Sequence, residues 1–181
     1  VDHWGIGNLD DQQNLTDWTC ANNLTSIYIA SYTPPWLAID NAECRNTNYP
    51  NGCRMWNNTL FGQAAVKQIE YLTRNTTSCL NKTMIEVWNE PDISFWMPNS
   101  TGANRTTDEA FWGVYNATYA EFKSRFPAVP VGCCGFSNIN DSSNPSGKNM
   151  MVDLSVQNIP HDFVSFHRYP SGDTLTNIRS Y

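Results

Sequence analysis

The sequence predicts an α/β fold in which parallel β-strands alternate with α-helices. Short runs of β-branched and aromatic residues alternate with longer segments whose apolar residues recur at helical spacing. This alternation is typical of parallel sheets with right-handed crossovers. The longest loops follow the strands, as in a (β/α)8 TIM-type barrel, where such loops build the binding face. An open doubly wound sheet is the competing fold, but no Gly-rich phosphate turn opens a helix here.

The expected elements follow one another in a regular order. Helices are expected at 10–22, 60–74, 108–126 and 148–158, and strands at 26–32, 84–90, 129–136 and 162–169. In the first helix, Leu15, Trp18 and Thr19 lie on one side. The 181 residues suffice for a single domain, residues 1–181, but are few for a complete barrel.

Charge and hydropathy exclude several classes of partner. The net charge is −6, from 11 basic and 17 acidic residues, without a cluster of Lys or Arg. We therefore expect no nucleic acid and no anionic membrane as partners. No apolar run approaches the ~18 residues that a membrane span needs. No cofactor is expected, and no metal site, because paired Cys-x-x-Cys motifs and nearby histidines are missing.

Glycosylation acceptors are unusually frequent. Nine Asn-x-Ser/Thr motifs begin at Asn14, Asn23, Asn57, Asn75, Asn81, Asn99, Asn104, Asn116 and Asn140. Such a number in one short chain predicts a protein that carries N-linked glycans and is secreted, extracellular or on the cell surface.

The cysteines agree with an oxidising compartment. Cys44 and Cys53 flank a loop rich in Asn, Pro and Gly, and we expect them to pair. Cys20 and Cys79 each precede an expected strand, so they lie at the same end of a parallel sheet and are expected to meet.

Two strand ends carry polar residues suited to catalysis. Pro91 removes a backbone donor and ends the strand before it, which places Glu90 at the C-terminal edge of the sheet. His167 and Tyr169 end the last expected strand and face the same way by alternation. A core histidine beside an aromatic plug is the alternative for these two residues.

Aromatic residues surround these strand ends. Tyr32, Trp36 and Trp96 lie at or just beyond them. They form either a hydrophobic cap or a platform on which sugar rings stack. Aromatic walls also favour the protonated form of Glu90, which suits a general acid. Glu86 lies four residues deeper, roughly 13 Å along an extended strand, and is expected to be structural.

Three stretches together resemble a known group of enzymes. VWNEPD followed by SFW is similar to the acid/base motif of clan A glycoside hydrolases, at the end of barrel strand four. SYTPPWLA resembles their third strand and DFVSFHRYP their sixth. The resemblance is closest to glycoside hydrolase family 39, which contains β-xylosidases and α-L-iduronidases. It covers about residues 10–170 and implies that the chain is the middle portion of a catalytic barrel.

The resemblance implies a role for each matching residue. Glu90 would be the general acid/base, and Asn89 would hydrogen-bond the sugar 2-hydroxyl. His167 and Tyr169 would orient the carboxylates. The sequence departs from the family at Gly132-Cys133-Cys134-Gly135, where glycines and a proline are usual. For these adjacent cysteines, a vicinal disulfide and two free thiols both stay open.

The second carboxylate of a retaining glycosidase is missing. The family places this nucleophile at the end of strand seven, whereas this chain resembles strands three to six and has no glutamate after Glu121. We therefore expect the chain to belong to a longer protein, or to associate with further chains that supply the missing barrel segments. The predicted function is a retaining glycosidase acting on an oligo- or polysaccharide. The alternative is an inactive, glycosylated surface protein that binds sugar or has a structural role.

Overall fold

A four-stranded parallel sheet forms the centre of the molecule. The computed structural model describes residues 9–38, 52–93, 95–96, 108–137 and 145–167. The strands lie in the order of the sequence: β1 (Ser26–Ala30), β2 (Thr83–Val87), β3 (Val131–Phe136) and β4 (Phe163–Phe166). All three neighbouring pairs are parallel. The predicted α/β class is confirmed, and the sheet corresponds to part of a barrel.

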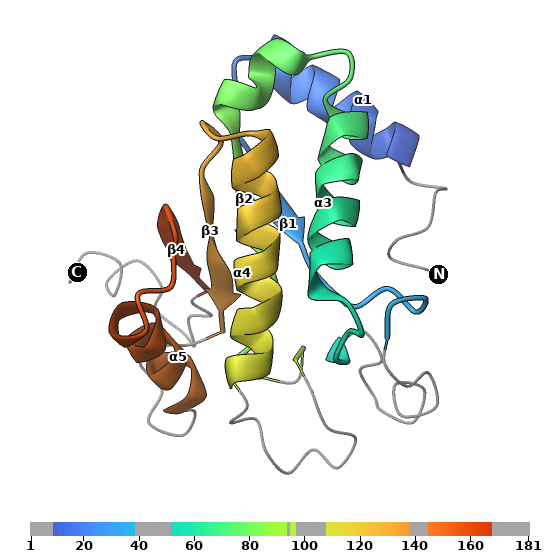
Figure 1. Cartoon of the computed structure of the whole chain (residues 1–181). Helices are drawn as coiled ribbons and strands as arrows, with labels where there is room; N and C mark the ends of the chain where they lie inside the picture. Colours follow the sequence, from blue (N-terminus) through green and yellow to red (C-terminus); the bar gives the residue numbers. More distant parts are fainter. Residues whose placement is uncertain (1–8, 39–51, 94, 97–107, 138–144, 168–181) are drawn as a thin grey trace, which may run out of the picture.

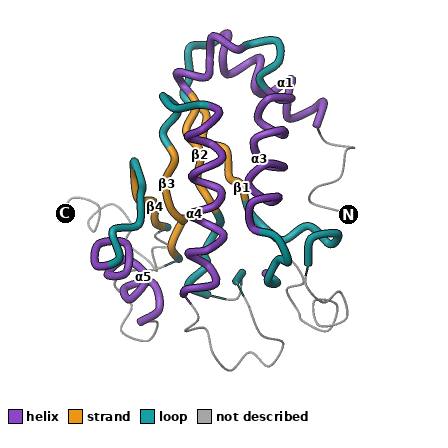
Figure 2. The backbone as a smooth tube through the Cα atoms, in the orientation of Figure 1, coloured by secondary structure: helices purple, strands orange, loops and turns teal. Residues whose placement is uncertain are grey.

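Helices connect the strands as the sequence predicts. They are α1 (Leu9–Ala21), α3 (Asn58–Leu72), α4 (Asp108–Arg125), α5 (Pro145–Val156) and the short 3-10 helix η3 (Thr77–Lys82). Helices α3 and α4 run side by side over one face of the sheet (Figure 1). Figure 2 shows how the strands lie behind this helical layer. None of the described helices is long and apolar enough to cross a membrane.

Hydroxyl groups, and not the large apolar side chains, join α1 to β1. Leu15 and Trp18 are 61% and 57% exposed, whereas Thr16 is buried. The hydroxyl of Thr16 lies 2.5 Å from that of Tyr28 on β1, and Thr19 lies 2.9 Å from Ser26 in the same way. Hydroxyl pairs therefore dock this helix, so the apolar stripe does not indicate the buried side.

A glycine brings α3 and α4 into close contact. A Cβ atom added to Gly62 would lie 3.0 Å from the Cα of Thr118 and 3.2 Å from the carbonyl oxygen of Ala117. Only a residue without a side chain allows the two backbones this separation. The start of α3 is fixed by Asn57, whose side chain accepts a hydrogen bond from the Leu60 N–H at 2.9 Å.

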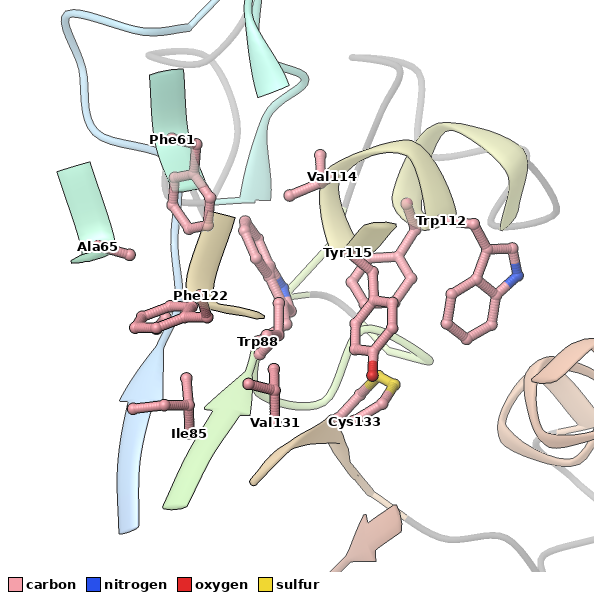
Figure 3. Close-up of a cluster of buried hydrophobic side chains, with 14 of the residues drawn as sticks. Phe61, Ala65, Ile85, Trp88, Trp112, Val114, Tyr115, Phe122, Val131 and Cys133 are labelled. Carbon is pink, nitrogen blue, oxygen red and sulfur yellow. A yellow bond between two sulfur atoms is a disulfide. The ribbon is translucent and has the colours of Figure 1, made fainter. Parts of the chain in front are cut away.

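Trp88 is the centre of the apolar core between the sheet and the helices. Its ring makes edge-to-face contacts with Trp96 and Phe111, at centroid distances of 5.1 Å and 6.2 Å. Figure 3 shows Trp88 surrounded by residues of both helices, above Ile85 and Val131 of the sheet. The indole N–H donates to the Phe95 carbonyl at 3.0 Å, so the buried polar atom is satisfied.

One disulfide joins segments that precede two strands, and another lies within a strand. Cys20 and Cys79 are bonded, with Cα atoms 5.7 Å apart, which confirms the expected pairing before β1 and β2. Cys133 and Cys134 form a vicinal disulfide within β3, so the first of the two open alternatives holds. Cys44 lies outside the described residues, and its pairing with Cys53 stays a prediction.

Candidate active site

Glu90 is held at the carboxyl end of β2 by an irregular turn. Trp88 and Glu90 have positive φ angles of 75° and 48°, in the left-handed region that bulky residues rarely adopt. The first of these turns the indole of Trp88 into the core, and the second directs Glu90 to the edge of the sheet. The Glu90 N–H donates to the carbonyls of Cys134 and Gly135 on β3, at 3.2 Å and 3.1 Å. The backbone of Glu90 is thus fixed to the neighbouring strand.

The carboxylate of Glu90 meets His167. Nδ1 of the imidazole lies 2.7 Å from Oε1 of Glu90, and the two side chains are 33% and 7% exposed. The backbone N–H of His167 donates to the Phe136 carbonyl at 2.6 Å, which holds the residue at the end of β3. Ser165 strengthens the same junction, because its hydroxyl donates to the Cys133 carbonyl at 3.1 Å and accepts from the Gly135 N–H at 2.8 Å. The structure therefore brings the ends of β2, β3 and β4 together around one carboxylate.

Asn89 and Tyr32 form a second polar pair beside Glu90. The Asn89 side-chain amide donates to the Tyr32 hydroxyl at 3.1 Å, which joins the end of β2 to the end of β1. The pKa of the Tyr32 phenol lies above its usual value. Burial is the main cause, the hydrogen bond with Asn89 partly opposes it, and the charge of Glu90 adds to the increase. Tyr32 also packs at 5.7 Å from the ring of Phe95. A phenol that keeps its proton can donate to Glu90 or to a ligand at this edge.

Asp92 is a residue of this region that the sequence reasoning missed. It is 1% exposed, and its two oxygens accept from the Ser137 N–H at 3.0 Å and from the Ser137 hydroxyl at 2.7 Å. These bonds fasten the loop after β2 to the end of β3. Its position directly after Pro91, at the same edge as Glu90, was the signal that could have identified it.

The predicted aromatic platform divides into exposed and buried residues. Trp36 is 54% exposed, and its carbonyl accepts from the Trp56 indole N–H at 3.2 Å. Trp96 is 3% exposed and packs on Trp88 and Phe111, so within the described residues it belongs to the hydrophobic core. Tyr169 lies outside the described residues. A sugar-stacking role thus has structural room at Trp36 and at Tyr32, and none at Trp96.

Glu86 lies near His167 of the candidate site. A Cβ atom added to Gly135 would lie 3.1 Å from Oε1 of Glu86 and 3.2 Å from Nε2 of His167. Gly135 itself has a φ angle of +57°. The expectation that Glu86 has a structural role, and is not the catalytic partner of Glu90, stays a prediction.

The described residues hold no cluster of His, Cys, Asp or Glu suited to a metal ion.

Six of the nine predicted glycosylation acceptors are described, and all six are exposed at the surface: Asn14, Asn23, Asn57, Asn75, Asn81 and Asn116. Asn99, Asn104 and Asn140 lie outside the described residues. Asn89, which is no acceptor, is half-buried beside Glu90.

Comparison with known proteins shows similarity in structure alone. No family model matches the chain, and no curated protein does. The GH39 enzyme from Xanthomonas axonopodis pv. citri is similar in structure, with a TM-score of 0.61 and 20% sequence identity, covering 88% of this chain and 29% of that one. A monomeric β-xylosidase from Caulobacter crescentus CB15 gives a TM-score of 0.62 and 17% identity, covering 87% of this chain and 29% of that one.

A GH39 β-xylosidase from Caulobacter crescentus is similar too, with a TM-score of 0.57 and 17% identity, covering 87% of this chain and 33% of that one. The chain thus spans about a third of the length of these enzymes. The predicted resemblance to family 39 is confirmed for the fold, and the four-stranded sheet matches part of a GH39 barrel.

Proposed function

We propose that this chain is the central part of a retaining glycosidase in which Glu90 is the general acid/base. The observation that carries the proposal is the 2.7 Å contact between His167 Nδ1 and Glu90 Oε1 at the carboxyl end of the sheet. That edge is where barrel enzymes collect their catalytic groups. The fold shared with GH39 enzymes supports the choice of reaction.

Glu90 serves two steps of the reaction. The Nδ1–H of His167 donates to Oε1, which orients the carboxyl group and leaves the transferable proton on Oε2. In the first step this proton passes to the glycosidic oxygen as the bond from that oxygen to the anomeric carbon breaks. A nucleophilic carboxylate, supplied from outside this chain, bonds to the anomeric carbon. In the second step Glu90 takes a proton from water, and the water oxygen displaces the nucleophile.

The neighbouring groups hold the substrate, an oligo- or polysaccharide. Asn89, oriented by Tyr32, donates to the sugar 2-hydroxyl, a bond that strengthens as positive charge develops on the ring. The exposed face of Trp36 offers a surface for the C–H face of a sugar. Further chains or barrel segments complete the site by supplying the nucleophile.

The substitution Glu90→Gln tests the assignment. It keeps the shape of the side chain and removes the transferable proton. Hydrolysis of substrates with poor leaving groups should fall by about 100-fold to 10,000-fold, while substrates with good leaving groups lose much less in the first step. The matched control is Glu121→Gln on α4, which should leave both rates unchanged. Equal losses for the two kinds of substrate would contradict proton donation by Glu90.

The alternative is a sugar-binding protein without hydrolysis. The exposed Trp36 favours it. Calorimetry with oligosaccharides distinguishes the two: binding without any product, which Trp36→Ala abolishes, would favour the alternative.

We also propose that the protein is secreted and N-glycosylated. The exposure of all six described acceptors supports this, because a glycan is bulky and hydrated and occupies only surface positions. Intact-glycopeptide mass spectrometry of native material should find glycans at Asn116 and at Asn75 or Asn81, with Asn89 unmodified. Nine unmodified acceptors would contradict the proposal.

A further inference from the structure

Gly135 leaves a gap that two ionisable side chains share. A Cβ atom placed on Gly135 would lie 3.1 Å from Oε1 of Glu86 and 3.2 Å from Nε2 of His167. Gly135 also has a φ angle of +57°, which disfavours any side chain there. A larger residue would fill the space between the carboxylate and the ring. The glycine therefore allows the two groups to face each other.

Each nitrogen of the imidazole thus has a carboxylate in its neighbourhood. Nδ1 lies 2.7 Å from Oε1 of Glu90, and Nε2 borders the gap next to Glu86. Glu86 is 6% exposed, and a buried carboxylate is costly unless a positive group or a hydrogen-bond donor lies close to it. An imidazole protonated on both nitrogens supplies both. Among the described residues, Tyr32 on the β1 side and Asp92, bound to Ser137, are further titratable groups of this edge.

We propose that Glu86 is a positioning residue that keeps a proton on Nε2 of His167 and thereby fixes the ring that orients Glu90. The catalytic meaning of this role rests on the proposed function. The carboxylate of Glu86 accepts from Nε2–H through one water in the gap over Gly135. With Nε2 engaged, Nδ1–H points at Oε1 of Glu90, and the ring cannot flip without losing both interactions. An acceptor beside each ring nitrogen thus holds the doubly protonated ring in one orientation.

Nitrogen-15 NMR of the histidine rings tests the proposal directly. The chain has three histidines, so His167→Gln assigns the ring signals of His167. In the unmodified protein near neutral pH, both Nδ1 and Nε2 of His167 should show shifts typical of protonated nitrogen. In Glu86→Gln the Nε2 signal should move to the range of unprotonated nitrogen, with at least a tenfold loss of the protonated form.

Two controls accompany this measurement. Glu121→Gln makes the same chemical change away from the site and should leave the His167 signals in place, and His161 serves as a reference within each sample. An unprotonated Nε2 in the unmodified protein would overturn the proposal. So would a protonated Nε2 that persists in Glu86→Gln.

A conservative variant covers the case in which Glu86→Gln does not fold. Glu86→Asp keeps the charge and withdraws it by one methylene, so the Nε2 proton signal should weaken, and an unchanged signal would contradict the proposal. The experiment needs no turnover. A protein without glycosidase activity would still show these changes, so a failure of the proposed function and a failure of this inference give different results.

Discussion

The residues that build the candidate site share an unusual backbone. Tyr32, Trp88 and Glu90 have positive φ angles of 72°, 75° and 48°, all at the carboxyl ends of β1 and β2. Each costs about 1–3 kcal/mol and persists because packing and hydrogen bonds hold it in place. Such angles are found where binding or catalysis requires a side chain to leave the regular direction of its strand.

These angles also explain which site residues could be predicted from the sequence. Glu90 and His167 follow from the position of strand ends alone, and that argument survives an irregular backbone. The expected separation of Glu86 from Glu90 assumed a regular extended strand, which the positive φ angles of Trp88 and Glu90 interrupt. The bonds between Asp92 and Ser137 depend on how the two loops meet, which periodicity does not encode.

Tyr32→Phe tests whether the phenol orients Asn89. The change removes the acceptor of a 3.1 Å hydrogen bond, so the Asn89 amide becomes free to rotate away from the substrate. The loss of one hydrogen bond, about 1 kcal/mol, corresponds to about a fivefold lower kcat/KM. Tyr28→Phe is the matched control, because the hydroxyl of Tyr28 contacts Thr16 on α1. That control should change the free energy of unfolding and leave kcat/KM as it is. Equal effects of both variants on kcat/KM would contradict the role of Tyr32.

At the scale of elements, every expected helix and strand is present, and the errors lie at their ends. Helices α3 and α4 have long apolar patterns, and their observed ends lie within two residues of the expected ones. The strand expected at 26–32 ends at Ala30, because the chain turns at Tyr32. The strand expected at 84–90 ends at Val87, because Trp88 has a positive φ angle. The docking of α1 through hydroxyl groups could not be predicted from an apolar stripe.

The contact between α3 and α4 yields a prediction about two helical glycines. Gly62→Ala gains helix propensity but forces a methyl group within 3.0 Å of the Thr118 backbone, so unfolding free energy should fall by about 1–2 kcal/mol. In Gly113→Ala the methyl group meets only the side-chain amide of Asn58, which can move. That variant should be as stable as the parent or more stable by up to about 1 kcal/mol. Urea denaturation measures both, and two stabilised variants would contradict the close contact.

At the scale of the whole molecule, the sheet is unequally covered. Helices α3 and α4 pack on one face (Figure 1). On β1, Ile27 and Ile29 alternate with Tyr28, which points to α1, and they are 58% and 50% exposed. Ile29 pairs in register with Glu86, so this exposed apolar face is continuous with the candidate site. In a closed barrel, side chains from opposite strands fill such a face.

The exposed face predicts that the 181-residue chain by itself associates through β1. Replacing Ile27 and Ile29 with threonine keeps strand propensity and removes apolar area, so self-association should weaken at least tenfold. Val152 and Val156 on α5 are 51% and 72% exposed and provide the matched control pair of threonine substitutions. Sedimentation equilibrium compares the variants. Equal weakening by both pairs, or by neither, would contradict a specific role of the β1 face.

The central claim is that Glu90 is the acid/base of a retaining glycosidase, and chemical rescue of Glu90→Ala by azide tests it most directly. In the variant, a substrate with a good leaving group still forms the glycosyl–enzyme intermediate, but water reacts with it slowly because no carboxylate removes the proton from water. Azide is an anion and needs no such proton removal, so it can react with the intermediate directly. The account predicts that azide restores turnover and that NMR finds a glycosyl azide with the anomeric configuration of the substrate. A glycosyl azide of inverted configuration would identify Glu90 as the nucleophile instead. Unaltered hydrolysis in the variant, with no azide product, would show that Glu90 takes no part in the reaction.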